Sequence, residues 1–183
     1  MGRTRTIDRG SVLDATERVI ARDGAVGLSI DAVAREAGIS KASVVYDHKS
    51  KAGLLTAMIR RRLDNDAERI EAAVNVCKDA PHPALYGRIA SALQVLSEME
   101  KAIVLAVSAS ASNEQTIKDP MREYTRIDLE AMESGPKPRA ALLAYLALSG
   151  LYSIELFGFH AWDETQREQI LQGIQTTYES YPE

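Results

Sequence analysis

The sequence predicts an all-α fold of about nine helices, and three observations support this prediction. Strand signals are nearly absent, because few β-branched residues alternate with polar ones. Apolar residues instead recur at helical spacing almost throughout the chain. With 183 residues, of which 45% are hydrophobic and 26% are charged, the chain has the ordinary balance of a protein that buries a core.

Glycine and serine residues delimit the first four helices. A helix is expected over residues 8–22, because Gly24 follows as a suitable C-terminal stop. Gly38 is placed in the same way to end the second helix. Serine hydroxyls accept hydrogen bonds from the free N–H groups of a first helical turn. The predicted N-caps of the second, third and fourth helices are Ser29, Ser40 and Ser50.

Proline residues mark the middle of the chain. The segment "DAPHP" (79–83) ends a long fourth helix, and a sixth helix is expected around residues 103–110. Asp119 and Pro120 predict the cap and the first position of a seventh helix, because proline is favoured where its missing N–H would have no partner. The side chains of the fifth helix that are expected to face the core are Leu85, Ile89, Leu93 and Leu96.

The last third of the chain contains its most apolar segment. After the interruption "SGPKP" (134–138), residues 139–159 carry apolar side chains on more than one side of a helix. A last helix is expected to begin at Asp163, which can form a capping-box-like pair with Gln166.

The stretch "VAREAGIS" has the composition of a helix-turn-helix corner. Ala34 allows two helices to cross closely, and Gly38 supplies the positive φ of the turn. The next helix exposes short hydroxyl side chains and a cation at its N-terminus, where they can reach bases and phosphates. A tight corner with solvated lysines also occurs in proteins that bind no DNA. The predicted outward residues are Ser40, Lys41, Ser43, Tyr46 and Asp47, followed by Lys49 and Lys51.

The distribution of charge favours the DNA-binding interpretation. Residues 1–62 hold 12 Lys and Arg against 7 Asp and Glu, whereas residues 63–183 hold 10 against 19. Residues 1–62, called the head below, are therefore basic although the whole chain has a net charge of −4. A basic head on an acidic body indicates that only the head approaches a polyanion. We expect a DNA-binding domain over residues 1–62 and a second helical domain over residues 63–183.

Residues 15–55 resemble the tetracycline-repressor-like (TetR family) transcriptional regulators. The resemblance includes the Gly24 stop, the "VAREAGIS" turn, and a gapless spacing from Gly38 to the "KSK" that ends at Lys51. It implies a homodimer that binds a palindromic operator in double-stranded DNA, with phosphate contacts from Ser29 and Lys51. It also implies that the residues facing the major groove are Ser40, Lys41, Ala42, Ser43 and Tyr46; the predicted DNA-binding residues further include His48 and Lys49.

The sequence departs from the family pattern at the end of the third helix. The family commonly has Leu-Tyr-x-His-Phe where this chain has "VVYDH" (44–48), so Val45 replaces a tyrosine and His48 a phenylalanine. Asp47 would repel DNA unless it accepts from a cytosine amino group or pairs with Lys51. His48 is either a packing replacement or a group that titrates near neutral pH.

A homodimer is also expected on physical grounds. The helix within residues 139–159 is apolar on more than one side, which indicates burial in its own bundle and against a copy of itself. A core helix of a monomer would give the same pattern. Gly150 would let two backbones approach closely, and the last helix could complete a four-helix interface. The predicted interface residues are Leu142, Leu146, Gly150, Ile154, Ile170, Ile174 and Tyr178.

A small-molecule effector, whose identity is open, is the remaining partner that the resemblance implies. Methionine and aromatic residues could line its pocket, although at helical spacing they more often fill a core. Glu155 is unusual within an apolar helix, and it could line a cavity, pair with Arg139 or Arg167, or face water. The predicted ligand-binding residues are Met99, Met121, Tyr124, Glu155 and Phe157.

The sequence lacks the motifs of enzymes and metalloproteins that an all-helical chain would need. It contains no Glu-x-x-His pair, no Gly-x-Ser-x-Gly and no Gly-rich phosphate loop, and its three histidines lie in separate segments. No catalysis, metal or cofactor is therefore expected. The single cysteine, Cys77, and the lack of a long apolar run favour a cytoplasmic protein without a membrane segment.

The predicted function is a DNA-binding transcriptional regulator, a repressor that a ligand in the C-terminal domain releases from DNA. One alternative is a DNA-binding regulator without a small-molecule inducer, controlled by a protein partner or by its abundance. The other is an all-helical enzyme or metal-binding bundle.

Overall fold

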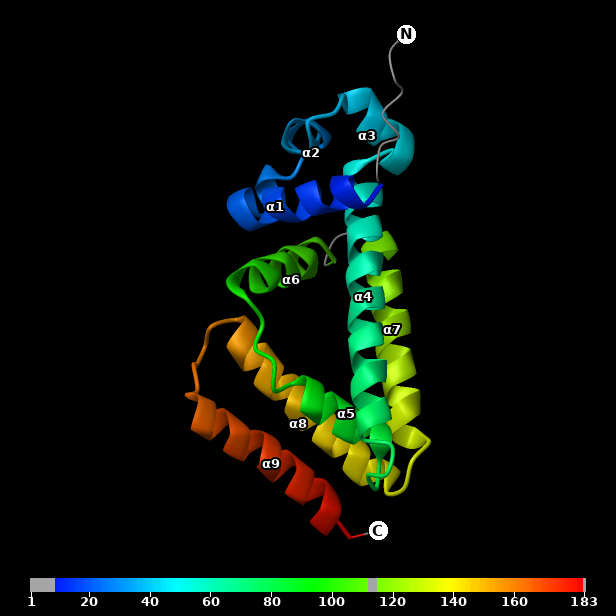
Figure 1. The fold of residues 1–183 in the computed structure, drawn as a ribbon, viewed down its shortest axis with the longest axis vertical. Coiled ribbons are helices and arrows are strands. Elements are labelled where there is room, and N and C mark those ends of the chain that lie inside the picture. The colour runs from blue at the N-terminus through cyan, green and yellow to red at the C-terminus, as the bar shows by residue number, and fades with distance from the viewer. Residues whose placement is uncertain (1–8, 112–114, 183) are drawn as a thin grey trace. The chain divides into compact units, whose positions relative to one another are not determined.

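The computed structural model describes residues 9–111 and 115–182, which form nine α-helices and no strand (Figure 1). The all-α prediction is confirmed. The helices are α1 (Arg9–Gly27), α2 (Ile30–Ala37), α3 (Lys41–His48), α4 (Lys51–Val76), α5 (Pro83–Ser91), α6 (Glu98–Ala111), α7 (Gln115–Glu133), α8 (Pro138–Leu156) and α9 (Glu164–Ser180).

The chain divides into two compact units, and each has its own hydrophobic core. Unit 1 contains Met1–Leu63 and Leu96–Met121, and unit 2 contains Asp64–Val95 and Arg122–Glu183. The packing of unit 1 therefore extends beyond the predicted DNA-binding domain and includes α6.

Unit 1 is built around α1, which packs against α2 on one side and against α6 on the other (Figure 1). The predicted inward face of α1 is buried, and the Thr16 hydroxyl donates to the Val12 carbonyl at 2.8 Å. The other core residues come from every helix of the unit and include Leu28, Val33, Val44, Leu54, Leu55, Met58, Ile59, Ile103, Val107 and Ile117.

The predicted glycine stops of α1 and α2 and the predicted serine caps of α2, α3 and α4 are confirmed by backbone angles and hydrogen bonds. Gly24 (φ 69°) breaks the helical geometry of α1, and Gly38 (φ 66°) ends α2 in the left-handed conformation. Serine hydroxyls accept from a backbone N–H three residues later at the starts of α2, α3 and α4. These caps are Ser29 to Ala32 (3.1 Å), Ser40 to Ser43 (3.1 Å) and Ser50 to Gly53 (3.0 Å).

The predicted start of the seventh helix is wrong. Pro120 lies inside α7, five residues after its first described residue, so Asp119 is not its N-cap. A proline there removes one backbone hydrogen bond and disfavours the helix. Ile117 is nevertheless fully buried and Met121 packs against the same core, so tertiary packing holds the helix through the proline.

Unit 2 packs α5 and α9 against α8. The predicted fifth helix is too long, because α5 ends at Ser91 and Leu93 is 57% exposed. Arg69 donates to the Ser91 carbonyl at 3.0 Å and so satisfies the end of the helix. The predicted capping box at the start of α9 is confirmed. The core of the unit is formed by Leu85, Ile89, Met132, Ala140, Ala141, Ala144, Leu148, Leu151, Leu171, Ile174 and Tyr178.

Within the described part of the chain, α8 is the one helix long and apolar enough to cross a membrane, judged by length and composition alone. A single such helix is weak evidence, since core helices of soluble proteins have the same properties.

Candidate nucleic-acid interface

One buried side chain anchors α3, and the opposite side of the helix is exposed. Val44 is fully buried against α1, α2 and the start of α4 in the unit 1 core. Tyr46, two residues later, is 85% exposed, and Ala42 also faces solvent. The predicted groove-facing residues are therefore all at least partly exposed, and they lie at the N-terminal end of α3 except for Tyr46.

The hydroxyl groups at the start of α3 bond to each other. The Ser40 and Ser43 Oγ atoms lie 2.7 Å apart, and Ser40 Oγ also accepts the Ser43 N–H. A hydroxyl can donate and accept, so this pair can contact either a base edge or a phosphate.

The three lysines of the predicted interface have different surroundings. Lys41 Nζ lies 2.8 Å from the Asp31 carboxylate, whereas Lys51 Nζ donates to the Ala25 carbonyl at 2.9 Å. Lys49 follows the end of α3 with a positive φ of 61°. Neither side-chain contact was predicted from the sequence, because each joins residues on different helices.

The departures from the family pattern occupy partly buried positions. Asp47 and His48 are both half-buried, whereas Val45 is 38% exposed. The half-buried position of His48 agrees with a packing role beneath the exposed face of α3.

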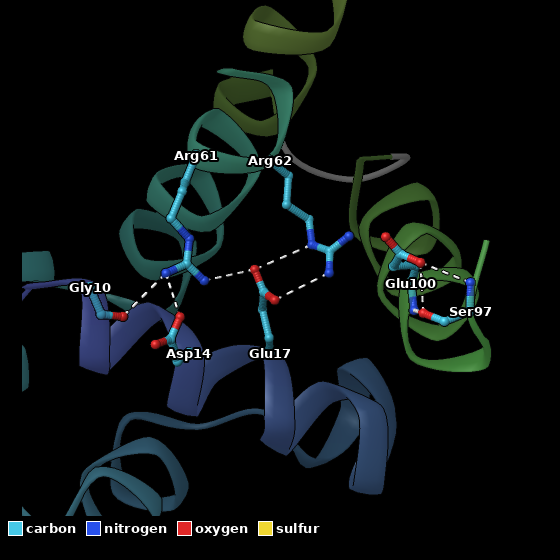
Figure 2. Close-up of polar contacts among 7 residues, drawn as sticks. All are labelled: Gly10, Asp14, Glu17, Arg61, Arg62, Ser97 and Glu100. Atoms are coloured by element: carbon cyan, nitrogen blue, oxygen red, sulfur yellow. Dashed lines mark hydrogen bonds and ion pairs between the residues drawn. The ribbon is translucent and has the colours of Figure 1, made fainter. Parts of the chain in front are cut away.

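Glu17 links α1 to α4 within unit 1. Its two carboxylate oxygens accept from Arg61 Nη2 at 2.8 Å and from Arg62 Nη2 at 3.1 Å (Figure 2). Arg61 also bonds Asp14 at 2.6 Å and the Gly10 carbonyl at 3.2 Å. Because Glu17, Arg61 and Arg62 are each at most about a quarter exposed, the bonds between them fix α4 firmly on α1.

A capping box that the sequence analysis missed starts α6. Ser97 N–H donates to Glu100 Oε2 at 2.8 Å, and Glu100 N–H donates to Ser97 Oγ at 3.3 Å (Figure 2). The Ser-x-x-Glu spacing at 97–100 is the sequence signal for this start.

A second set of ion pairs joins α1 to α2. Glu36 accepts from Arg18 Nε and Arg22 Nη1, each at 2.8 Å. Hydrogen bonds from Arg18 and then from Arg22 lower the pKa of the Glu36 carboxyl. The two arginine side chains are about half exposed, so this contact positions side chains more than it stabilises the head.

The predicted ligand-binding residues are distributed over both units. Met99 is 47% exposed and Met121 packs against the core of unit 1, whereas Tyr124, Glu155 and Phe157 belong to unit 2. Of the alternatives left open for Glu155, the structure shows the ion pair with Arg167, at 2.6 Å from Nε, and both side chains are largely buried. Phe157 is half-exposed and stacks on Phe159 with ring centroids 5.5 Å apart.

Tyr124 belongs to a buried polar cluster in unit 2 that the sequence analysis missed. Arg88 donates to the Tyr124 hydroxyl at 2.8 Å and to Asp128, and Tyr124 donates to Asp66. Tyr145 donates to the other Asp128 oxygen at 3.0 Å. Burial raises the pKa of the Asp128 carboxyl, while the Arg88 charge opposes this effect. Arg69 also pairs with Asp66, so two arginines face the two carboxylates, and the contacts tie α4, α5, α7 and α8 together.

We expect the Tyr145 phenol to titrate at high pH. Burial, followed by the Asp128 charge, raises its pKa to about 12. Because the folded pKa is raised, the stability that it contributes is present below the unfolded pKa of roughly 10 and is lost as pH rises through the folded value. Phenolate absorbance of the wild type minus that of Tyr145→Phe should therefore rise near pH 12. A difference that rises at the ordinary tyrosine pKa would contradict this assignment.

The predicted dimer residues divide into exposed and buried groups. Leu146 is 53% exposed, Ile154 is 36% exposed and Gly150 also faces solvent, whereas Leu142 and Ile170 are half-buried. Ile174 and Tyr178 are corrected to core residues of the protomer, since they are only 7% and 2% exposed. They point inward because the buried face of α9 is the one that packs on α8.

No group of three or more His, Cys, Asp or Glu side chains that could hold a metal ion occurs among residues 9–111 and 115–182.

Comparisons with known proteins identify the family. A family model described as "Bacterial regulatory proteins, tetR family" matches residues 12–58, and a second, "Tetracyclin repressor-like, C-terminal domain", matches residues 86–179. No curated protein sequence matches the chain.

Solved structures show the same fold at low sequence identity. A TetR transcription regulator from Haloarcula marismortui is 16% identical with a TM-score of 0.74, and the match covers 93% of this chain and 96% of that one. The multidrug binding protein EbrR complexed with malachite green is 20% identical (TM-score 0.71, coverage 91% and 96%). A protein from Saccharomonospora viridis in complex with choline is also 20% identical (TM-score 0.70, coverage 94% and 95%). With family models matching both its head and most of its C-terminal part, the chain belongs to the TetR family of transcriptional regulators.

Proposed function

We propose that the protein is a homodimeric repressor that binds a palindromic operator by placing α3 of each protomer in the major groove. The observation that carries this proposal is the exposed face of α3. Val44 fixes the helix from below, while Ser40 and Lys41 face outward at its N-terminal end and Tyr46 faces outward near its C-terminal end. Ser29, at the N-cap of α2, and Lys51, at the start of α4, are assigned to flanking phosphates.

An exposed stripe along α8 supports the proposed dimer. The stripe follows helical spacing and contains no charged side chain, and Gly150 at its centre has no atom near the position that a Cβ would occupy. A second chain can therefore approach this face closely. The residues of the α8 stripe are Leu143, Leu146, Ala147, Gly150, Ser153, Ile154 and Phe157, all exposed.

The helix packed against α8 has an uncharged exposed face as well. On α9 the acidic residues occupy a separate face, so a third, neutral face lies between the buried and the acidic ones. Two α8–α9 pairs related by a two-fold axis would bury these neutral faces in one isologous interface. The neutral face of α9 consists of Gln166, Gln169, Ile170, Gly173, Thr177 and Ser180.

We infer that a small molecule controls this repressor from the C-terminal domain and that the protein acts in the cytoplasm, where DNA is accessible. The complexes of EbrR with malachite green and of the Saccharomonospora viridis protein with choline support an organic effector. Such a ligand releases DNA only if it binds more tightly to the conformation that does not fit the operator. A thermal-shift screen of lipophilic and cationic compounds tests this inference.

Selection of bound fragments from a random DNA pool tests the DNA-binding function. The expected result is a palindrome whose half-sites are one helical turn apart, because two copies of α3 must enter successive major grooves. Recovery of a single, non-repeated motif would contradict the dimer, and recovery of no enriched sequence would contradict specific binding.

Replacing Tyr46 by alanine should change sequence preference without changing stability. The side chain is 85% exposed, so its loss leaves the core intact. A base contact carries discrimination of about 1–3 kcal/mol at one position, so the selected motif should lose information there. Equal weakening on every sequence would instead assign Tyr46 to the phosphate backbone, and an unchanged melting temperature serves as the control for folding.

A further inference from the structure

Lys41, which the proposed function places in the major groove, is already paired with a carboxylate of its own head. Its Nζ lies 2.8 Å from Asp31 Oδ2, and the two side chains are 60% and 61% exposed. The ion pair therefore lies on the surface that a duplex would approach. Asp31 is on α2 and Lys41 is on α3, so the pair bridges the two helices of the helix-turn-helix.

The stability of the helices explains the position of Asp31 but not the position of Lys41. Asp31 lies in the first turn of α2, where the positive end of the helix dipole favours a carboxylate. Lys41 is the first residue of α3, where the same dipole disfavours a cation. The position of Lys41 is thus unfavourable for its own helix, and the Asp31 carboxylate offsets this local cost.

Four other carboxylates of the head, those of Asp14, Glu17, Asp23 and Glu36, have arginine partners outside α3. Glu36 is held by Arg18 and Arg22, and Glu17 by Arg61 and Arg62. Asp31 differs because its partner is a lysine of the proposed recognition helix.

We propose that Asp31 is an intramolecular counter-ion that DNA must displace from Lys41. The inference rests on the proposed function, because it requires α3 to meet the duplex. A phosphate or base acceptor competes with the carboxylate for one ammonium group, and after the exchange the Asp31 charge is left beside the polyanion. The pair therefore lowers the affinity for an arbitrary duplex. It also lowers the salt dependence, because the cation that Lys41 releases from the DNA is offset by one that the freed Asp31 carboxylate takes up.

The test compares wild type with Asp31→Asn, using fluorescence anisotropy and a labelled duplex of random sequence at several salt concentrations. An exposed ion pair is worth little, so the variant should bind about two- to fivefold more tightly per head at low salt. Its plot of log affinity against log salt should be steeper by about one unit per head. Asp79→Asn, in the exposed turn after α4, makes the same change of net charge away from the head and should leave both quantities unchanged.

A double-variant cycle with Lys41→Met separates displacement from simple repulsion. If Asp31 acts through Lys41, the gain from Asp31→Asn should be clearly smaller when Lys41 is absent, because only the repulsion between the Asp31 carboxylate and the duplex then remains. An equal gain in both backgrounds, or an unchanged salt slope in Asp31→Asn, would overturn the proposal. A wild-type protein that binds no duplex at low salt would instead overturn the proposed function itself, so the two failures are distinguishable.

Discussion

Replacing Ala147 by glutamate is expected to convert the dimer to monomers and to abolish operator binding. Ala147 is exposed within the α8 stripe, about one turn before Gly150, so the protomer itself has room for the longer side chain. In an isologous interface the substitution buries two carboxylates without partners, and each costs several kcal/mol. The dimer dissociation constant should therefore rise by a factor of about 10³ or more.

Sedimentation velocity measures the mass in solution, and binding to the selected operator measures the consequence. Ala72→Glu is the matched control, because Ala72 is an exposed alanine on α4, outside the proposed interface. The control should remain dimeric. A dimeric Ala147→Glu protein would show that the α8 stripe is not the interface.

Replacing Asp128 by alanine should give the largest loss of stability among single changes in the polar cluster of unit 2. The variant leaves Arg88 buried without its main carboxylate and removes the acceptor of the Tyr145 hydroxyl. Breaking a buried ion pair by removing one partner costs about 3–5 kcal/mol. The remaining contact of Arg88 with Tyr124 places the expected loss near the lower limit, about 3 kcal/mol.

Glu130→Ala is the control for this prediction, because Glu130 lies on the same helix and also pairs with an arginine, Arg126, but in the solvent. Its loss should leave the melting temperature essentially unchanged. Chemical denaturation of both variants gives the comparison, and similar stabilities would show that burial of the Arg88–Asp128 pair contributes little. Each kcal/mol lost should lower Tm by roughly 2–4 °C for a protein of this length.

Local signals determine the part of the fold that could be predicted from the sequence. Serine caps and left-handed glycines act within four residues, so the boundaries of α2 and α3 followed directly from the sequence. Pro120 shows the limit of such rules. A proline is a local signal for a helix start, but here the buried side chains of Ile117 and Met121 prevail, and they depend on a core that the sequence does not display.

The candidate site was predictable in its residues but not in its pairings. Exposure of Tyr46 and burial of Val44 follow from helical spacing alone. The partners of Lys41, Lys51 and Glu17 are 10, 26 and at least 44 residues away in sequence, and helix packing alone brings them together. The structure was also needed to divide the predicted interface residues into exposed and buried ones. An apolar residue on α9 could pack in the core of the protomer or lie exposed in a dimer interface, and the sequence pattern is the same for both.

The bond from Lys51 to the Ala25 carbonyl has a consequence for the thermodynamics of association. A free lysine side chain loses about 1.5–2 kcal/mol of rotamer entropy when it is immobilised. The ammonium group has three N–H donors and the carbonyl takes one of them, so the side chain can be oriented and still donate to a phosphate. Folding of the head therefore preorganises Lys51, and in the proposed complex this lowers the entropic cost of its contact with the DNA backbone.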